Sequence, residues 1–194
     1  MKVAFCIYDG MTVLDIVGAY DPITRLDRMD FMPLEWDICA ATEDVSADGW
    51  ALGVDRIKPD LGEYDLVFLP GGFASRELRH DGEFVEWIET AASCEYLTSV
   101  CTGSLLLGAA GFLDGKRATT HPSAFDTLSE YAEVVDDRVV RDGNVITGRG
   151  VSSSIDLGLY VVEMLSDAET RKAIAAQMDY PYGSEVFSDL EPTE

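Results

Sequence analysis

The sequence predicts an α/β fold, specifically a three-layer sandwich with a mostly parallel central sheet. Continuous apolar runs such as Val3–Ile7 and Leu66–Leu69 are typical of strands that are buried on both faces of a parallel sheet. Amphipathic helical segments alternate with these strands, and one strand turns sharply into a helix at Cys101. With 47% hydrophobic residues, the chain suits a single domain over residues 1–180, followed by an irregular acidic tail at 181–194.

The individual elements follow from the spacing of the apolar residues. In the first half we expect a strand at Val3–Ile7, a helix from Val13 to about Arg28, a strand at Leu34–Ala40, short strands within Trp50–Ile57, a strand at Leu66–Leu69 and a helix at Glu83–Ala92. In the second half we expect a strand at Tyr96–Val100, a helix at Gly103–Ala110, a strand at Arg117–Thr119, a helix at Ser123–Tyr131, hairpin strands at Val139–Val140 and Val145–Thr147, and helices at Ser154–Leu165 and Ala168–Gln177.

The charge of the chain excludes some classes of partner. The formal net charge is -22, from 36 acidic and 14 basic residues, so binding to a nucleic-acid backbone is not expected. The acids are scattered along the chain, which favours adaptation to a salty cytoplasm in which ions screen their repulsion. The alternative is an ordinary acidic protein.

The cysteines and the hydropathy pattern indicate the compartment. Cys6, Cys39, Cys94 and Cys101 are far apart in the sequence, so we expect reduced thiols and neither a disulfide framework nor a metal site. No apolar run is long enough to cross a bilayer, and the first residues do not resemble a signal peptide. The sequence therefore predicts a cytoplasmic protein with no membrane partner.

Cys101 is the strongest candidate for a reactive group. It lies between a β-branched strand and the small residues that open an apolar helix, which is the layout of a nucleophile elbow. The positive end of the helix dipole behind it is expected to lower the pKa of the thiol toward thiolate. The alternative is a small core residue, because free cysteine is often buried.

Two further segments could complete a site around this cysteine. Asp15 lies between apolar residues near the start of the first helix, where it is either a helix-start acid or an acid/base group with a raised pKa. Gly71 and Gly72 follow a strand, and the N–H groups of Gly72 and Thr102 could form an anion hole. An ordinary strand-ending turn is the alternative for the two glycines. Ligands of such folds bind beyond the carboxyl ends of the strands, so one pocket could hold all of these groups.

His121 is the remaining candidate. It follows a predicted strand, and a histidine beside a cysteine is the usual way to activate a thiol. The sequence cannot place its ring beside Cys101, so a structural histidine is the alternative.

Together these motifs carry a family resemblance. The segments Leu14–Gly18, Leu69–Gly72, Thr98–Ser104, Lys116–His121 and Arg138–Asn144 resemble the ThiJ/PfpI superfamily, which is class I glutamine-amidotransferase-like, and within it most closely the isonitrile hydratases. The resemblance runs from residue 1 to about residue 179. It implies a flavodoxin-like sandwich, a homodimer, Cys101 as the nucleophile and Asp15 as its proton partner.

The resemblance also implies an activity. A hydratase of this kind converts an isonitrile to an N-substituted formamide without a cofactor, through attack of the cysteine on the terminal carbon. Protease-like relatives carry histidine directly after the cysteine, so Thr102 argues against peptidase activity. His121-Pro122 is closer to the chaperone/deglycase branch. A cofactor-free glyoxalase or deglycase and a redox-sensing stress protein therefore remain alternatives.

Overall fold

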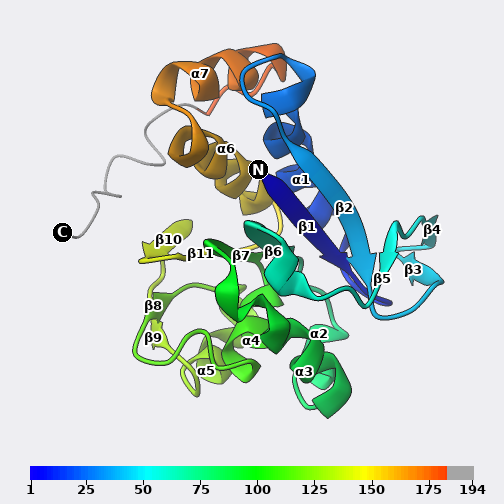
Figure 1. The fold of residues 1–194 in the computed structure, drawn as a ribbon. Coiled ribbons are helices and arrows are strands. Elements are labelled where there is room, and N and C mark those ends of the chain that lie inside the picture. The colour runs from blue at the N-terminus through cyan, green and yellow to red at the C-terminus, as the bar shows by residue number, and fades with distance from the viewer. Residues whose placement is uncertain (183–194) are drawn as a thin grey trace.

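A seven-stranded sheet forms the centre of the protein (Figure 1). The structure is a computed structural model and describes residues 1–182. In spatial order the strands are β10 (Val139–Asp142), β11 (Val145–Gly148), β7 (Tyr96–Val100), β6 (Leu66–Leu69), β1 (Lys2–Ile7), β2 (Glu35–Ala40) and β5 (Arg56–Ile57). Every neighbouring pair is parallel except β10 with β11, which confirms the predicted α/β fold with a mostly parallel sheet.

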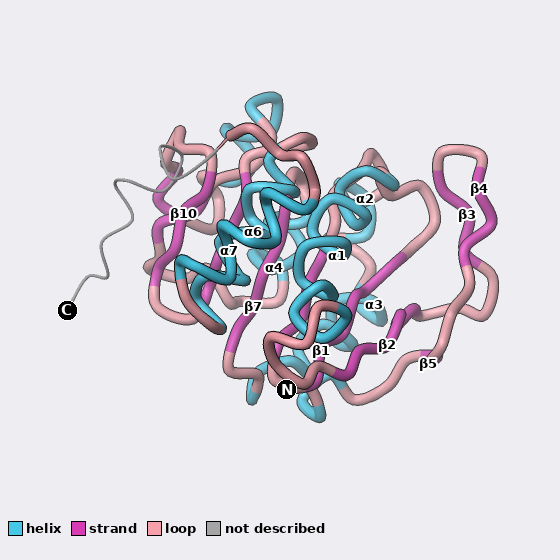
Figure 2. Tube along the Cα trace, turned by 90° about the horizontal axis from the view of Figure 1, so that it is seen from above, coloured by secondary structure: helices cyan, strands magenta, loops and turns pink. Residues whose placement is uncertain are grey.

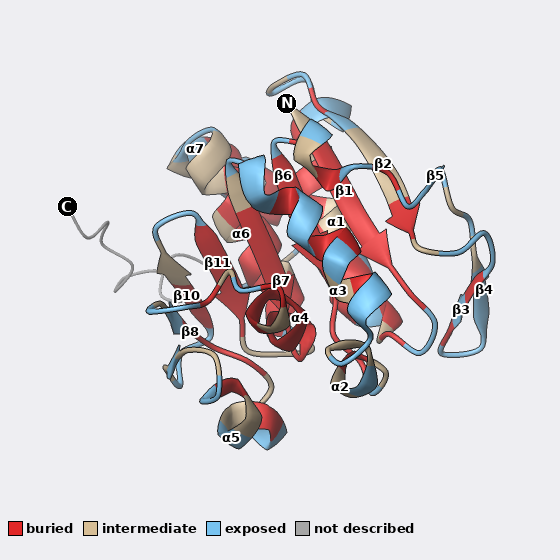
Figure 3. Cartoon of the chain, turned by 60° about the horizontal axis from the view of Figure 1, so that its bottom comes forward, coloured by how far each residue is buried: buried red, intermediate tan, exposed pale blue. Residues whose placement is uncertain are grey.

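Helices cover both faces of this sheet (Figures 1 and 2). One layer consists of α1 (Val13–Arg28), α6 (Ser153–Leu165) and α7 (Ala168–Gln177). The other consists of α2 (Ser75–Leu78), α3 (Gly82–Glu89), α4 (Gly103–Ala109) and α5 (Phe125–Leu128), with short 3-10 turns at Leu61–Glu63, Thr90–Ser93 and Pro122–Ala124. Because both faces are covered, β1, β6 and β7 are buried over nearly their whole length (Figure 3).

Close packing of α1 on α6 fixes the start of α1 relative to the sheet. Pro22 lies inside α1, and a Cβ added at Gly158 of α6 would be only 2.5 Å from its Cγ. Glycine at that position therefore lets the two helices approach each other without a clash. This contact helps to hold α1, whose first turn carries Asp15, against α6.

The region around Trp50–Ile57 differs from the expectation in one respect. The strand β4 (Trp50–Leu52) pairs antiparallel with β3 (Val45–Ala47), a strand that the sequence did not indicate, while β5 joins the main sheet beside β2. Asp48 and Gly49 form the turn of the hairpin with positive φ angles of 50° and 82°, as a two-residue hairpin turn requires. Each strand of this hairpin has only three residues, too few for a visible alternation of apolar and polar side chains.

Three other elements are shorter or placed differently than predicted. The strand expected at Arg117–Thr119 is β8 (Arg117–Ala118), and it pairs with β9 (Glu133–Val134) outside the main sheet. The helix expected at Ser123–Tyr131 is a 3-10 turn followed by the four-residue α5, and α3 gives way to a 3-10 turn at Thr90. The short helix α2 was not expected at all.

The predicted tail at 181–194 lies outside the described residues except for its first two positions. Within residues 1–182, no helix is both long and apolar enough to span a membrane. The central strands β1, β6 and β7 end at the same edge of the sheet, next to the point where the strand order reverses between β1 and β6. This edge is where an open α/β sheet binds its ligands.

Candidate active site

The elbow at Cys101 is held by the backbone on both sides. Cys101 follows β7 directly and has a φ of +55°, in the left-handed region that few non-glycine residues adopt. Its N–H donates to the carbonyl oxygen of Gly148 at 2.9 Å, and its own carbonyl accepts from the Thr120 hydroxyl at 2.9 Å. These bonds stabilise the strained turn that directs the thiol away from the strand, as the sequence predicts for a nucleophile elbow.

Gly71 lies directly against this elbow. A Cβ added to Gly71 would be 2.4 Å from the Thr102 nitrogen and 2.7 Å from the Cys101 Cβ, so no larger residue fits there without displacing backbone. The N–H of Gly71 donates to Asp15 Oδ2 at 2.9 Å. The loop after β6 therefore connects the carboxyl group of α1 to the elbow.

Asp15 is fully buried in the first turn of α1, next to the thiol. Burial raises the pKa of its carboxyl group to about 7, although the hydrogen bond from Gly71 and the neighbouring Cys101 thiol lower it, and the charge of Asp48 adds a smaller increase. Oδ1 has no hydrogen-bond partner among the described residues. The Cys101 thiol lies close enough to this carboxyl for each group to shift the pKa of the other. The structure therefore brings together the two groups that the sequence predicts as nucleophile and proton partner.

The pKa of the Cys101 thiol differs from the expectation. Burial, followed by the negative charge of Asp15, raises the pKa of Cys101 to about 12. The amide and hydroxyl groups of Thr102 lower that pKa but do not outweigh burial, because Cys101 is only 6% exposed. The expectation that the helix terminus lowers the pKa of this thiol is therefore wrong, because burial and the charge of Asp15 raise it instead.

The expected anion hole also needs correction. The Gly72 N–H donates to the Thr102 hydroxyl oxygen at 3.0 Å, so this amide is already used inside the protein. The Thr102 N–H, in contrast, lowers the pKa of the Cys101 thiol. Of the two predicted donors, the Gly72 N–H is therefore directed at the Thr102 side chain and not at the reacting sulfur.

The His121 ring forms its hydrogen bonds with Ser123 and not with the thiol. Its Nδ1 is 2.9 Å from the Ser123 hydroxyl and accepts from the Ser123 N–H at 3.2 Å, so the ring caps a 3-10 turn. A Cβ added to Gly150 would lie 3.2 Å from the His121 ring and 3.4 Å from Cys101. One glycine therefore separates the histidine from the cysteine.

Sequence reasoning missed Ser75, Thr120 and Tyr8. Ser75 is fully buried in the unexpected helix α2, and its hydroxyl is 2.7 Å from the Thr102 hydroxyl. The Tyr8 hydroxyl donates to the Pro70 carbonyl at 2.7 Å. Burial and the neighbouring charges of Asp15 and Cys101 raise the pKa of Tyr8 well above its usual value. Only their positions in the sequence could have indicated these residues. Tyr8 directly follows the strand β1, and Ser75 lies three residues after Gly72, so both come soon after strands that end at the site.

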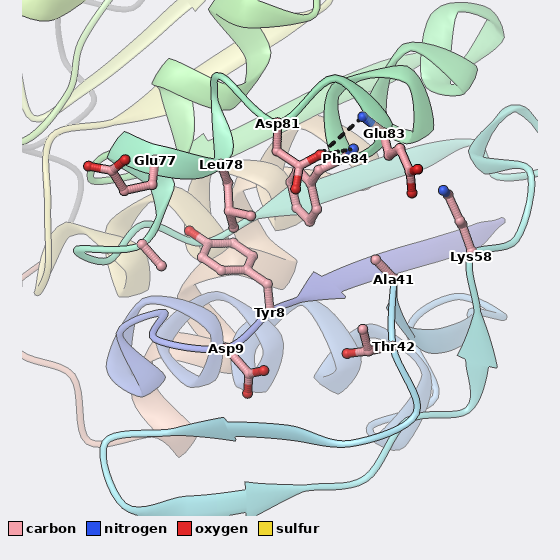
Figure 4. Close-up of a pocket in the computed structure, with 11 residues that line it drawn as sticks. Tyr8, Asp9, Ala41, Thr42, Lys58, Glu77, Leu78, Asp81, Glu83 and Phe84 are labelled. Carbon is pink, nitrogen blue, oxygen red and sulfur yellow. Dashed lines mark hydrogen bonds between the residues drawn. The ribbon is translucent and has the colours of Figure 1, made fainter.

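Tyr8 also lines a groove of about 410 Å³ (Figure 4). Its lining combines apolar and charged side chains, among them Tyr8, Leu78, Phe84, Glu77, Glu83 and Lys58. In the part of the chain that the structure describes, Cys101 and Asp15 do not line this groove, and no group of three or more Cys, His, Asp or Glu side chains could hold a metal ion. Tyr8 is the side chain shared by the groove and the surroundings of the thiol.

Comparisons with known proteins agree on one family. The sequence profile of the DJ-1/PfpI family matches residues 1–164. The isonitrile hydratase of Pseudomonas putida is 36% identical over 182 residues, which cover 93% of this chain and 78% of that protein. Protein DJ-1alpha of Drosophila melanogaster is 33% identical over 124 residues, which cover 62% of this chain and 57% of that protein. The crystal structure of a ThiJ/PfpI family protein from Pseudomonas syringae superposes with a TM-score of 0.84 at 33% identity, over 93% of this chain and 75% of that one.

Proposed function

The chain belongs to the DJ-1/PfpI family, and from this premise we propose that it is a cysteine-dependent hydratase that converts isonitriles to N-substituted formamides. The observation that carries the proposal is the buried pair of Asp15 and Cys101. A carboxyl group with a pKa of about 7 can both accept and return a proton near neutral pH. Similarity to an isonitrile hydratase over 93% of the chain supports the substrate class.

In the first step the Cys101 sulfur forms a bond to the terminal carbon of the isonitrile, R–N≡C. The thiol proton passes to Asp15 and from there to the same carbon, which gives the thioimidate R–N=CH–S–Cys. An isonitrile carbon accepts both the nucleophile and the proton, so no anion remains on the substrate. The Thr102 N–H, which lowers the pKa of the Cys101 thiol, stabilises negative charge on the sulfur during the attack.

In the second step water adds to the thioimidate carbon and the carbon–sulfur bond breaks. One proton of the water ends on the nitrogen and the other returns through Asp15 to the sulfur. The product is R–NH–CHO, and the free thiol is regenerated. A high thiol pKa is compatible with this scheme, because the proton moves to Asp15 as the sulfur attacks.

The test is turnover of an aryl isonitrile by the purified protein in concentrated potassium chloride, with the formamide identified by mass spectrometry. In water labelled with ¹⁸O, the label is expected in the formyl oxygen. Cys101→Ala is expected to abolish turnover, while Cys94→Ala, which removes another buried thiol, is expected to retain it. Absence of formamide from the folded wild-type protein would refute the proposal.

Aldehyde chemistry is the second candidate function, because the chain also matches DJ-1 proteins and carries His121 near the thiol. Here the Cys101 sulfur would add to a glyoxal-type aldehyde to form a hemithioacetal. Conversion of methylglyoxal to lactate without a cofactor, together with no formamide production, would favour this candidate. Redox sensing is less favoured, because oxidation proceeds through the thiolate and the Cys101 thiol has a raised pKa.

We also propose that the protein is a cytoplasmic homodimer. All four cysteines are free thiols, which suits a reducing compartment. Leu14 and Val17 of α1 are about half exposed, and Trp50 of the hairpin is 63% exposed, so apolar surface is available for a partner. Light scattering is expected to give twice the chain mass of 21.2 kDa, and a monomer mass would contradict the homodimer.

A further inference from the structure

We propose that Arg76 is a specificity-determining residue of the Cys101 site, and that the isonitriles this protein takes carry a carboxylate on an apolar body. The inference rests on the proposed hydration of isonitriles at Cys101 and names the class of substrate more closely. Arg76 connects two segments that border the elbow, and its guanidinium group forms no ion pair within residues 1–182.

The start of α2 lies against the elbow. The Ser75 hydroxyl is 2.7 Å from the hydroxyl of Thr102, the residue after the reactive cysteine. The preceding loop is equally close, because a Cβ added to Gly71 would be 2.7 Å from the Cys101 Cβ. Arg76 directly follows Ser75 and, unlike that fully buried serine, is partly exposed. Its side chain therefore begins beside the elbow and can be reached from solvent.

Hydrogen bonds link the Arg76 guanidinium to a second segment beside the elbow. Its Nη2 donates to Ser123 Oγ at 3.1 Å, and this oxygen is 2.9 Å from Nδ1 of His121. The Cδ2 of the His121 ring and the Cβ of Cys101 both lie within 3.4 Å of the position that a Cβ on Gly150 would take. Because glycine has no Cβ, residue 150 leaves that position open. The bonds from Arg76 through Ser123 therefore lead to the space beside Cys101.

The positive charge of Arg76 is not neutralised by a neighbouring acid. The chain has 36 acids and 14 bases, and most of its lysines and arginines lie within 4.0 Å of a carboxylate. Arg149, which precedes Gly150, is paired with Asp136 at 2.9 Å. In residues 1–182 no carboxylate lies that close to Arg76, and Ser123 accepts from only one of its five N–H groups. A charged donor group without an acid partner therefore lies next to the site.

Phe73 adds an apolar surface to this charge. Its side chain is 85% exposed, and the Arg76 Cζ lies 5.6 Å from the centre of its ring, which helps to hold the guanidinium in place. A guanidinium pairs with a carboxylate through two parallel N–H bonds, and an exposed phenyl ring can cover an apolar group next to that carboxylate. The ligand that suits both is an isonitrile whose terminal carbon reaches Cys101 while its carboxylate pairs with Arg76.

The groove that Tyr8 lines does not suit a carboxylate (Figure 4). Its charged lining consists of Lys58 and four acids, Asp9, Glu77, Asp81 and Glu83. Acids that outnumber the single base repel a negatively charged group. Arg76 is therefore the group beside the thiol that would stabilise a carboxylate on the substrate.

The first experiment compares turnover of para-isocyanobenzoate with turnover of its uncharged methyl ester. In about 1 M potassium chloride the screening length is about 3 Å, so the net charge of the chain has little effect on either compound. Arg76→Gln is expected to lower the ratio of kcat/KM for the acid to kcat/KM for the ester about 10-fold, because one hydrogen-bonded charge pair is lost. Arg76→Lys keeps the charge but not the planar fork, so it is expected to retain part of the preference.

The second experiment measures the same preference without an isonitrile. Cys101 is alkylated with para-iodoacetamidobenzoate or with its methyl ester in the same salt, and the modified residue is assigned by peptide mass. Both reagents attack the same thiol, so the ratio of their rates is independent of the thiol's own reactivity. Arg76→Gln is expected to lower the ratio of the acid rate to the ester rate about 3- to 10-fold.

Arg79→Gln is the matched control. It removes the same charge three residues further along the chain, from a guanidinium that is already paired with Glu130 at 3.0 Å, and it is expected to leave both ratios within twofold. Unchanged ratios in Arg76→Gln, or an equal fall in Arg79→Gln, would overturn the inference. If the wild type hydrates neither isonitrile while Arg76→Gln still lowers the alkylation ratio, the proposed hydration fails and the recognition of a carboxylate by Arg76 stands.

Discussion

Replacing Asp15 with asparagine is expected to stabilise the protein at alkaline pH while it removes the proposed proton partner of the thiol. Burial raises the pKa of this carboxyl from 3.8 to about 7. An acid that binds its proton more tightly in the folded state loses stability as the pH rises from the unfolded pKa to the folded one. About 3 pKa units at 1.36 kcal/mol each amount to a loss of about 4 kcal/mol by pH 8. Asparagine does not titrate, so the variant escapes this loss.

The assay is urea unfolding of both proteins between pH 4 and pH 8 at one fixed, high salt concentration. The many other acids titrate in both proteins, so their contributions cancel when the free energy of unfolding of one protein is subtracted from that of the other. The free energy of unfolding of Asp15→Asn minus that of the wild type is therefore expected to grow through this range and to level off above pH 7. Any pH-independent change in packing would add only a constant offset.

Asp126→Asn supplies the control, because it removes the same charge from an exposed position on α5. Its difference from the wild type is expected to stay within about 0.5 kcal/mol at every pH. A difference for Asp15→Asn that stays flat between pH 4 and pH 8 would show that the Asp15 carboxyl is not held at a raised pKa. That result would refute the conclusion that burial raises the pKa of Asp15.

Three further predictions concern packing and charge. Gly71→Ala is expected to destabilise the protein by about 3 kcal/mol or more in urea unfolding, since its Cβ would lie 2.4 Å from the Thr102 nitrogen, and a near-neutral result would contradict the described contact. Gly158→Ala should cost about 1–3 kcal/mol in the same assay, because the added methyl group meets Pro22, and wild-type stability would argue against the close packing of α1 on α6. With a net charge of -22, the melting temperature should rise strongly between 0.1 M and 3 M potassium chloride, and full stability in dilute buffer would exclude the halophilic interpretation.

The sequence predicted an element correctly where the pattern of residues that indicates it lies within one segment of the chain. The range Val13–Arg28 matches α1, and the elbow lies at Cys101, because periodicity and the change from β-branched to small residues are visible in a single segment. The hairpin strand β3 and the helix α2 have three and four residues, which is too short for a pattern to emerge. Elements of this size form because tertiary contacts hold them.

The electrostatic state of the site could not be read from the sequence. The helix terminus behind Cys101 was visible and predicted a lowered pKa, whereas the burial of the thiol and the nearness of Asp15 depend on how α1 packs. These two effects outweigh the donors at the helix terminus. Likewise, the use of the Gly72 N–H by the Thr102 side chain follows from a contact between residues 30 positions apart.

The position of Gly148 in the chain has a consequence for synthesis on the ribosome. The bond from the Cys101 N–H to the Gly148 carbonyl closes the elbow, yet Gly148 is translated 47 residues after the cysteine. Until β11 emerges and pairs with β7, the nascent thiol lacks this closure and has the pKa of about 8.5 that is usual for a free cysteine. The growing chain therefore passes through an interval in which Cys101 is more open to oxidants than in the finished protein. Newly made molecules, and not mature ones, are the population in which oxidative damage at this residue should accumulate first.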